Sequence, residues 1–446
     1  MTTQSKISPA FQPFLAHSHP DARKDAIVIY RGLLSPGSMP QPGTAAYFDT
    51  LKQQAQNNQS ISNQIINDYQ SATRQSFYTA PVGQGSLPIT QIEVTRQSLP
   101  ILAEHPEVIA ILPNQNIHLI EPKEIDYSGL EKQELEDKLT WGLKRLEIPK
   151  VWETTQGQNV TVAVLDSGVQ GDHPALKGRV KDFIVIDPLG RRITASPSFD
   201  SGQHGTHVCG TIAGGKTEDG ISIGVAPQAD LIVAGVLVGE STLLTLVEGI
   251  SWAVEKGAKI INMSLGLSYY EPLFPQIFDI LVNQYGILPV VAIGNENHGN
   301  TSSPGNAYNA FSVGAVEQIE TNNLGITFFS SGASLVFPAD APNTWVTKPD
   351  VSAPGAQVYS CIPPVKLDNG VFQYTYMDGT SMATPHIAGV AALLMSAYPQ
   401  APLSKIIDVL KKTAYHPGGE EQRPDNRWGW GMVQPLEALK ALKSMG

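Results

Sequence analysis

Between residues 160 and 315 the chain contains five short segments that are apolar along their whole length, and helical patterns separate and follow them. A strand without a polar face has to be covered on both faces, and strands that alternate with helices form parallel sheets. The expected strands are 160–166, 230–236, 259–263, 287–293 and 311–315. The expected helices are 208–213, 243–256, 275–285, 382–397 and 402–413. We therefore predict an α/β domain over residues 141–446, a parallel sheet with helices on both faces.

The chain before residue 141 is organised differently. Residues 1–24 contain scattered Pro and His without periodicity, which is typical of a mobile arm. Residues 25–121 show the order strand, helix, strand, strand, helix, strand, which predicts a small α+β ferredoxin-like domain. Its first helix is expected at 44–58 and runs into a Gln/Asn-rich patch at 53–64, which we expect to be a solvated helix face and turn. Residues 122–140 are acidic and lack a firm apolar face, so we expect a linker with some helix in it.

Charge and hydrophobicity exclude several classes of partner. With a net charge of −11 and no long basic run, the chain gives no support for nucleic-acid binding. No apolar run reaches about 18 residues, so no membrane span is expected. The first 19 residues hold a single Lys and no apolar core segment, and the two cysteines, Cys209 and Cys361, allow at most one disulfide. These features favour a cytoplasmic location, with secretion by an unusual route as the alternative.

Three motifs rich in small residues carry groups with chemical potential. Asp166 ends an apolar strand, His204 stands among small residues at a helix start, and Ser381 lies where a loop enters an apolar helix. Seen singly, such residues are usually turn formers, core histidines and helix caps. Together they supply what serine chemistry needs: a nucleophile, a base that takes its proton, and a carboxylate that orients the base.

The motifs Asp-Ser-Gly at 166–168, His-Gly-Thr-His at 204–207 and Gly-Thr-Ser-Met-Ala-Thr-Pro-His at 379–386 resemble those of the subtilisin-like serine proteases, in the same order. The resemblance runs from about Trp141 to the C-terminus and includes Arg-Trp-Gly-Trp-Gly at 427–431. It implies a subtilisin-like fold and a triad in which Asp166 orients His204. His204 would act as general base and then acid, and Ser381 would attack the scissile carbonyl.

The same resemblance implies the rest of the site. Asn295 matches the family's oxyanion-hole asparagine, which acts together with the backbone N–H of Ser381. Residues 262–266 resemble the edge segment that pairs with the main chain of a substrate. The substrate-binding residues implied are Ser264, Leu265, Gly266 and Gly294.

The N-terminal unit resembles the subtilisin propeptide, through its order of elements and through the stretch 108–114. This resemblance implies an intramolecular inhibitor and folding aid over residues 25–121, whose tail lies in the cleft like a substrate. We expect self-processing between Ile117 and Thr140, because the tail leads into a polar linker with few expected packing contacts.

No cofactor is implied for the chemistry, and no metal site is predicted. Many relatives place an acidic calcium ligand after His-Pro, where this chain has Ala175, and the loop 215–220 also departs from the usual calcium loop. We therefore expect the firm calcium site to be missing. A weaker structural calcium site stays open, because three aspartates, Asp182, Asp187 and Asp200, share one long connection.

The sequence thus predicts a serine endopeptidase that is made as a self-inhibited precursor and acts on peptides or proteins. One alternative is a dedicated intracellular protease that matures a single peptide. Another is a catalytically silent binding protein that keeps the fold. An α/β-hydrolase is excluded, because residues 379–383 lack the second glycine of the nucleophile elbow and the triad order differs.

Overall fold

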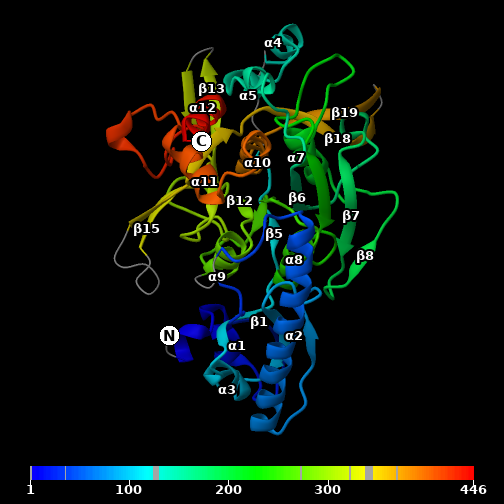
Figure 1. Cartoon of the computed structure of the whole chain (residues 1–446), viewed down its shortest axis with the longest axis vertical. Coiled ribbons are helices and arrows are strands. Elements are labelled where there is room, and N and C mark those ends of the chain that lie inside the picture. The colour runs from blue at the N-terminus through cyan, green and yellow to red at the C-terminus, as the bar shows by residue number, and fades with distance from the viewer. Residues whose placement is uncertain are drawn as a thin grey trace.

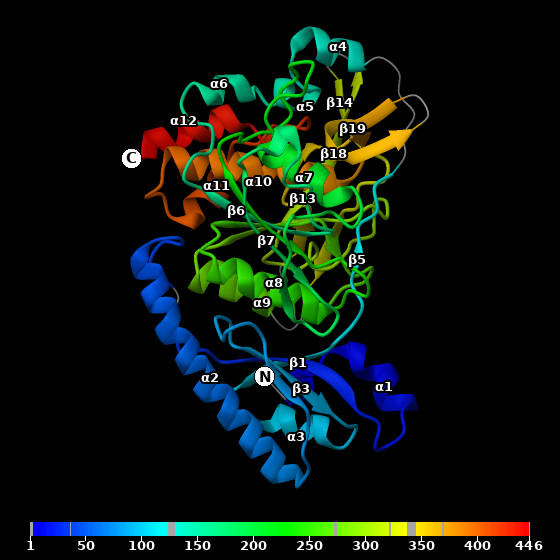
Figure 2. The same cartoon turned by 90° about the vertical axis from the view of Figure 1, so that its right-hand side faces the viewer.

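The computed structural model describes residues 3–35, 37–123, 130–271, 274–320, 323–336, 345–367 and 370–445. An N-terminal domain (residues 3–113) and a larger C-terminal domain (residues 141–445) lie one above the other in Figure 1. The segment between them runs up one side of the C-terminal domain, as Figure 2 shows. None of the helices in the described part has both the length and the hydrophobicity needed to cross a membrane.

A nine-stranded sheet forms the centre of the C-terminal domain, in the order β14-β13-β12-β10-β6-β9-β7-β8, with β17 paired to β13. Pairs from β13 to β7 are parallel, and the edge strands β14 and β8 are antiparallel to their neighbours. The bounds are β6 Thr161–Asp166, β7 Val180–Ile186, β8 Arg192–Thr194, β9 Asp230–Gly235, β10 Ile260–Met263, β12 Leu288–Ala292, β13 Phe311–Glu320, β14 Asn323–Ile326 and β17 Val351–Pro354. The five predicted strands are β6, β9, β10, β12 and β13, so the predicted α/β fold is confirmed.

Helices cover both faces of this sheet. Successive strand residues point to opposite faces: Val164 of β6 lies in the core formed with α7, α10, α11 and α12, and its neighbour Leu165 lies in the core formed with α8 and α9. This double burial explains why the central strands are mainly apolar. The helices are α5 Trp141–Arg145, α6 Ile148–Trp152, α7 His204–Ala213, α8 Leu243–Glu255, α9 Pro275–Asp279 with a π-helical turn at Ile280–Gln284, α10 Thr380–Ala397, α11 Leu403–Lys412 and α12 Pro435–Met445.

Two hairpins stand beside this framework. The sequence patterns did not predict them, and neither belongs to the central sheet. They are β15 Ala333–Val336 with β16 Trp345–Lys348, and β18 Val358–Leu367 with β19 Gly370–Met377.

The N-terminal domain has the expected strand and helix order. Its sheet has the order β2-β3-β1-β4, and β1 is antiparallel to both β3 and β4, which is the ferredoxin-like arrangement. The elements are β1 Lys24–Tyr30, α2 Ala45–Thr73, β2 Thr79–Pro81, β3 Ile89–Val94, α3 Ser98–Glu104 and β4 Val108–Pro113.

Helix α2 is 29 residues long and extends well beyond the expected 44–58. The Gln/Asn-rich patch is helical throughout, and three of its polar side chains, Gln54, Asn58 and Ser62, are buried rather than solvated. Gln54 Nε2 donates to Asn58 Oδ1 at 2.8 Å, and Asn58 Nδ2 donates to the carbonyl of Gly85 at 2.9 Å. These hydrogen bonds satisfy the buried amides, which is why the helix can bury a polar stripe.

One face of the N-terminal sheet belongs to the core of the C-terminal domain. Ile27 and Ile29 of β1 share a hydrophobic cluster with α8 and α9, whereas Ala26 and Val28 face the domain's own helices α2 and α3. The two domains therefore have one continuous core between them.

Polar contacts flank this shared core. The Gly83 N–H donates to Glu248 Oε2 at 2.6 Å, and Arg192 holds the other oxygen of Glu248 at 2.5 Å. Asn114 Oδ1 accepts the N–H of Leu244 at 3.0 Å, in the first turn of α8. These contacts fix the N-terminal domain over one end of α8 and along its side.

Residues 3–17, expected to be part of a mobile arm, are packed, so this prediction is wrong for them. They form η1 Thr3–Lys6, η2 Pro9–Phe11 and α1 Gln12–His17. Phe11 is fully buried in the N-terminal core, and Ser8 Oγ donates to the buried Glu271 Oε2 at 2.5 Å. These contacts, together with the N–H of Ser8 that donates to the Ile111 carbonyl at 2.9 Å, order the segment without any periodic apolar pattern.

The predicted linker is docked as well, in the part that is described; residues 124–129 lie outside it. Helix α4 (Leu130–Asp137) places Glu134 against the C-terminal domain, where its side chain is buried. The acidic stretch is therefore not a solvated connection over its second half.

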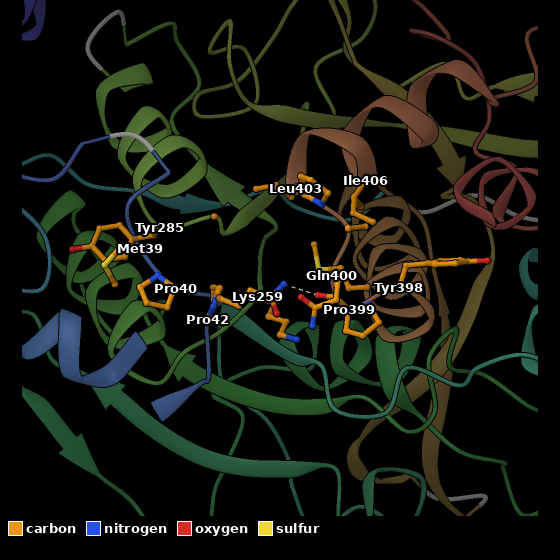
Figure 3. Close-up of a pocket in the computed structure, with 15 residues that line it drawn as sticks. Met39, Pro40, Pro42, Lys259, Tyr285, Tyr398, Pro399, Gln400, Leu403 and Ile406 are labelled. Carbon is orange, nitrogen blue, oxygen red and sulfur yellow. Dashed lines mark hydrogen bonds between the residues drawn. The ribbon is translucent and has the colours of Figure 1, made fainter. Parts of the chain in front are cut away.

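A cavity of about 160 Å³ lies where the loop before α2 meets the C-terminal domain (Figure 3). Residues 39–42 form one wall, and residues 398–403 form another. Gln41 Nε2 spans the two by donating to the Pro399 carbonyl at 2.7 Å. Lys259 and Tyr285 also line this cavity. The N-terminal domain thus reaches around to the segment between α10 and α11.

Candidate active site

Asp166 and His204 come from different elements and meet because two glycines let those elements approach. Asp166 is the last residue of β6, and His204 is the first of α7. A Cβ on Gly205 would lie 2.1 Å from the carbonyl oxygen of Gly168, so only glycine fits there. With this close approach, His204 Nδ1 lies 2.8 Å from Asp166 Oδ1 and 3.0 Å from Oδ2, and both side chains are buried.

Ser381 lies in the first turn of α10, and a proline in the same helix leaves the Ser381 carbonyl available to a hydrogen-bond donor from outside the helix. Pro385, four residues later, has no N–H, so the carbonyl of Ser381 lacks its usual helical partner. Ser264 Oγ donates to that carbonyl at 3.2 Å. The Pro in the motif thus links the nucleophile's helix to the segment expected to bind substrate.

Asn295 is held against the start of the same helix. Its Oδ1 accepts from both the N–H and the hydroxyl of Thr380 at 2.9 Å, which turns its Nδ2 outwards. Gly294 has φ +115°, and a Cβ there would lie 2.6 Å from Ser302 Oγ, so this position requires glycine. The amide of Asn295 is therefore a preorganised hydrogen-bond donor beside Ser381.

The tail of the N-terminal domain runs through this site as an added strand. β5 (His118–Leu119) pairs antiparallel with β11 (Leu265–Gly266), with Leu119 opposite Leu265 and His118 opposite Gly266. Ile120 continues the pairing, because its N–H points to the Ser264 carbonyl at 3.4 Å. Further on, the N–H of Lys123 donates to the Asp378 carbonyl at 2.7 Å.

Two successive carbonyls of this tail contact the predicted machinery. Ser381 Oγ donates to the carbonyl of Ile120 at 3.1 Å, and Asn295 Nδ2 donates to the carbonyl of Glu121 at 2.8 Å. The nucleophile and the oxyanion donor thus engage neighbouring peptide units rather than the same one.

The charge state of His204 is set by its neighbours. Burial opposes a charge on this imidazole, yet its pKa is raised, because Asp166 hydrogen bonds to it and Asp200 and Glu121 add negative potential. Burial lowers the pKa of His207 on the same helix to about 3, so His207 is neutral at physiological pH. His204 Nε2 has no hydrogen-bond partner within the described part of the chain. The ring therefore has a free nitrogen to accept a proton.

Ser381 and Asn295 contact the tail directly, whereas Asp166 and His204 form a pair of their own, and no hydrogen bond joins His204 Nε2 to Ser381 in the described part of the chain. Ser264 and Gly266 offer main-chain groups to the tail, and Gly294 supports Thr380, whose Oγ1 lies 3.3 Å from the Gly294 nitrogen. Leu265 contributes only its main chain, because its side chain is buried in the core with α8 and α9.

The motif analysis missed the residues that hold these groups in place: Ser167, Asp200 and Thr380. Ser167 and Thr380 lie inside the motifs named above, but the sequence alone does not show their hydrogen-bond partners. Asp200 was noted only as one of three crowded aspartates.

The chain's residues do not fit the family's firm calcium site. The Ala175 side chain packs in the hydrophobic core, and its carbonyl accepts the Gly215 N–H at 2.8 Å. In the facing loop, Glu218 accepts a hydrogen bond from Gln373 at 2.7 Å. The three crowded aspartates are not gathered either: Asp182 pairs with Lys256, and Asp187 pairs with Arg191. The expectation about calcium stays a prediction.

Comparison with known protein families assigns the chain to one of them. Residues 157–431 match the model of the subtilase family, peptidase S8, and this match covers more than half of the sequence. The chain belongs to the subtilase family. The resemblance found in the motifs is thereby confirmed.

Curated relatives agree with this assignment. Fervidolysin of Fervidobacterium pennivorans is 32% identical over 357 residues, which cover 74% of this chain and 48% of that protein. Subtilisin E of Bacillus subtilis (strain 168) is 34% identical over 289 residues, covering 64% and 68%. An intracellular serine protease of Paenibacillus polymyxa is 34% identical over 281 residues, covering 60% and 77%. The match thus spans about half the length of fervidolysin.

A solved structure shares the fold. The crystal structure of fervidolysin, described as a keratinolytic enzyme related to subtilisin, superposes with a TM-score of 0.67 at 24% identity. The superposition covers 95% of this chain and 62% of that one. At this identity the likeness concerns the fold alone, and it confirms the predicted subtilisin-like architecture.

Proposed function

We propose that this chain is a serine endopeptidase made as a self-inhibited precursor, with Asp166, His204 and Ser381 as its triad and Asn295 in the oxyanion hole. The observation that carries the proposal is the path of residues 118–121. Their main chain pairs with β11, and two of their carbonyls contact the nucleophile and the oxyanion donor. A strand added to an exposed edge is a common way to bind an extended peptide.

In the proposed hydrolysis of a peptide bond, each group has a role. His204 Nε2 takes the proton of the Ser381 hydroxyl as Oγ bonds to the carbonyl carbon, and the C=O electron pair moves onto the oxygen. Asn295 Nδ2 stabilises this oxyanion. The C–N bond then breaks, and the imidazolium returns its proton to the leaving amine. Water repeats the sequence on the acyl-enzyme, while Asp166 holds the Nδ1–H throughout.

The bound tail is in an inhibited arrangement. Attack requires that one carbonyl receive both the Ser381 oxygen and the Asn295 hydrogen bond, whereas here the two groups engage Ile120 and Glu121 separately. Rotation of the peptide unit between them would bring the Ile120 carbonyl to Asn295. We therefore propose the Ile120–Glu121 bond as the processing site, within the expected window of 117–140.

The tail also suggests which substrates the site takes. Ile120 is 9% exposed and Ile117 is 3% exposed, whereas His118 between them is exposed. We propose that the enzyme prefers an aliphatic residue before the scissile bond and another three positions earlier. A peptide-library digest tests this preference. It also separates a general endopeptidase from a protease dedicated to one peptide, since a dedicated enzyme would cleave few library members.

Replacement of the nucleophile tests the proposal as a whole. Ser381→Ala should lose roughly 10⁴-fold or more of peptidase activity and stay full length, whereas wild type should yield a fragment that begins at Glu121. Ser444→Ala, a change at an exposed serine in α12, is the matched control.

Two results would contradict the proposal. Unchanged hydrolysis by a contaminant-free Ser381→Ala preparation would remove Ser381 from its role. Failure of wild type to react with a fluorophosphonate probe, with the N-terminal domain removed, would favour a silent binding protein instead.

A further inference from the structure

The Asp200 carboxylate lies in the loop before α7, and no step of the proposed reaction uses it. Its Oδ1 accepts from Ser167 Oγ at 2.7 Å and from the N–H of Gly202 at 3.0 Å. Its Oδ2 accepts from the N–H of Thr206 at 2.8 Å and from the Thr206 hydroxyl at 2.6 Å. Four donors from three places in the chain thus converge on one side chain.

These contacts stabilise the first turn of α7, because the helix has no N-cap side chain of its own to satisfy its first N–H groups. Gln203 occupies the N-cap position and makes no side-chain cap, so the first N–H groups need partners from elsewhere. The Gly205 N–H donates to Ser167 Oγ at 3.0 Å, and the Thr206 N–H donates to Asp200. Ser167 directly follows Asp166 in the chain. The turn that carries His204 is therefore tied to the strand end that carries its partner.

We propose that Asp200 is a positioning residue: its carboxylate fixes the start of α7, and with it the His204 imidazole, against Asp166. The inference rests on the proposed peptidase function and adds a residue to that same site.

Asp200 also decides where the proton of Ser167 points. Ser167 Oγ has one proton and two carboxylate oxygens in reach, Asp200 Oδ1 at 2.7 Å and Asp166 Oδ1 at 3.2 Å. The shorter contact directs the proton to Asp200. Asp166 Oδ1 then remains able to accept the His204 Nδ1–H, and the Ser167 oxygen accepts the N–H of Gly205.

Only a carboxylate satisfies this arrangement. Backbone N–H groups cannot rotate, and one of them faces each oxygen: Gly202 at Oδ1 and Thr206 at Oδ2. The amide of Asp200→Asn would meet one of these donors with its own NH₂ group. The substitution keeps the size of the side chain yet breaks at least one fixed contact, which leaves a donor unpaired and loosens the turn.

The substitution also changes the field around the base. The titratable groups that face His204 are Asp166 on β6, Asp200 in its loop, Glu121 on the bound tail and His207 on α7. Once cleavage makes Glu121 a free N-terminal residue that no longer lies in the site as part of the bound tail, Asp166 and Asp200 are the two of these carboxylates that the fold itself holds beside the imidazole. Removing the Asp200 charge therefore lowers the affinity of His204 for its proton.

The test compares kcat, KM and the pH profile of kcat/KM for wild type, Asp200→Asn and Asp172→Asn, all in the processed form. Asp172→Asn makes the same chemical change at an exposed carboxylate. We expect Asp200→Asn to lower kcat about tenfold or more, as small misplacements of a base do, with KM within about twofold. The acidic limb of its profile should move to lower pH, which a loss of packing alone would not cause. Asp172→Asn should match wild type.

The outcomes separate this inference from the function it rests on. An inactive wild type would overturn the proposed function. If wild type is active and Asp200→Asn has the same kcat and the same acidic limb as wild type, only the role of Asp200 is overturned. If Asp200→Asn does not fold, Thr206→Val decides, because it keeps the carboxylate but removes the hydroxyl that donates to Asp200 and accepts the Gln170 N–H. A lower kcat at constant KM supports the role, and a kcat within twofold of wild type overturns it.

Discussion

Glu134 should make the stability of this protein fall as the pH rises towards neutrality. Its side chain is buried, with Oε1 accepting the Trp141 N–H at 2.8 Å and Oε2 accepting the Tyr376 hydroxyl at 2.7 Å. Burial raises its pKa from 4.5 to about 7, against the two hydrogen bonds that lower it and with help from Asp137 and Glu131. The folded protein therefore holds a proton that the unfolded chain has already released.

The sign and size of the effect follow from this difference. Below about pH 4.5 the carboxyl is protonated in both states and has no effect. Between there and about pH 7 only the folded state holds the proton, so the free energy of unfolding decreases as the pH rises. At about 1.36 kcal/mol per pKa unit, the loss is complete above pH 7 and amounts to about 3 kcal/mol.

Glu134→Gln isolates this contribution, because the amide mimics the protonated acid: its oxygen can accept from Trp141 and its NH₂ can donate to the Tyr376 oxygen. Urea unfolding at pH 5 and pH 8, in a Ser381→Ala background that prevents autolysis, should show a loss with pH about 2–3 kcal/mol smaller in Glu134→Gln than in the parent. Equal pH dependence in the two proteins would refute the reasoning.

Three further outcomes are expected. Lys348→Ala should cost about 3–5 kcal/mol in urea unfolding, because the fully buried Lys348 holds Asp350 at 2.8 Å; a loss under about 1 kcal/mol would contradict this. Gly83→Ala should loosen the N-terminal domain, since φ is +60° and a Cβ would lie 1.9 Å from Ser251 Oγ. Hydrogen exchange along α8 would rise, but not in Gly178→Ala, where φ is +75° and the space is open. EDTA and millimolar calcium should give nearly the same Tm, whereas a ligand at a thousandfold excess over Kd would add about 4 kcal/mol.

The central sheet was predictable because its strands are buried on both faces and therefore carry an unbroken apolar signal. β7 was missed: its first half, Val180–Phe183, contains Lys181 at an exposed and Asp182 at a partly exposed position, which hides the strand. The β18–β19 hairpin was missed for a similar reason, since much of it is partly exposed. Strands at the margins of a fold are specified by their neighbours more than by their own pattern.

The site residues also divide into those that the sequence predicted and those that it missed. The motifs supplied Asp166, His204, Ser381 and Asn295, because those side chains have chemical requirements that few other residues meet. They could not show that Ser381 and Asn295 engage successive carbonyls, since main-chain contacts leave no mark on sequence. Glu134 was assigned to a linker because residues 122–140 are acidic and lack a firm apolar face; only the tertiary structure brings the Trp141 N–H and the Tyr376 hydroxyl to it.

The sharing of one core between the two domains has a consequence for the timing of activity. Once the tail is cut, a departing N-terminal domain would take with it a sheet face whose Ile27 and Ile29 now pack in the core shared with α8 and α9. Exposing that face weakens the domain's own fold, and a loosened chain is a ready substrate for the protease it has just left. On the proposed function, inhibition would then end by destruction of the inhibitor. Each molecule would be activated once, and the lifetime of the interface between the two domains would set the time of its activation.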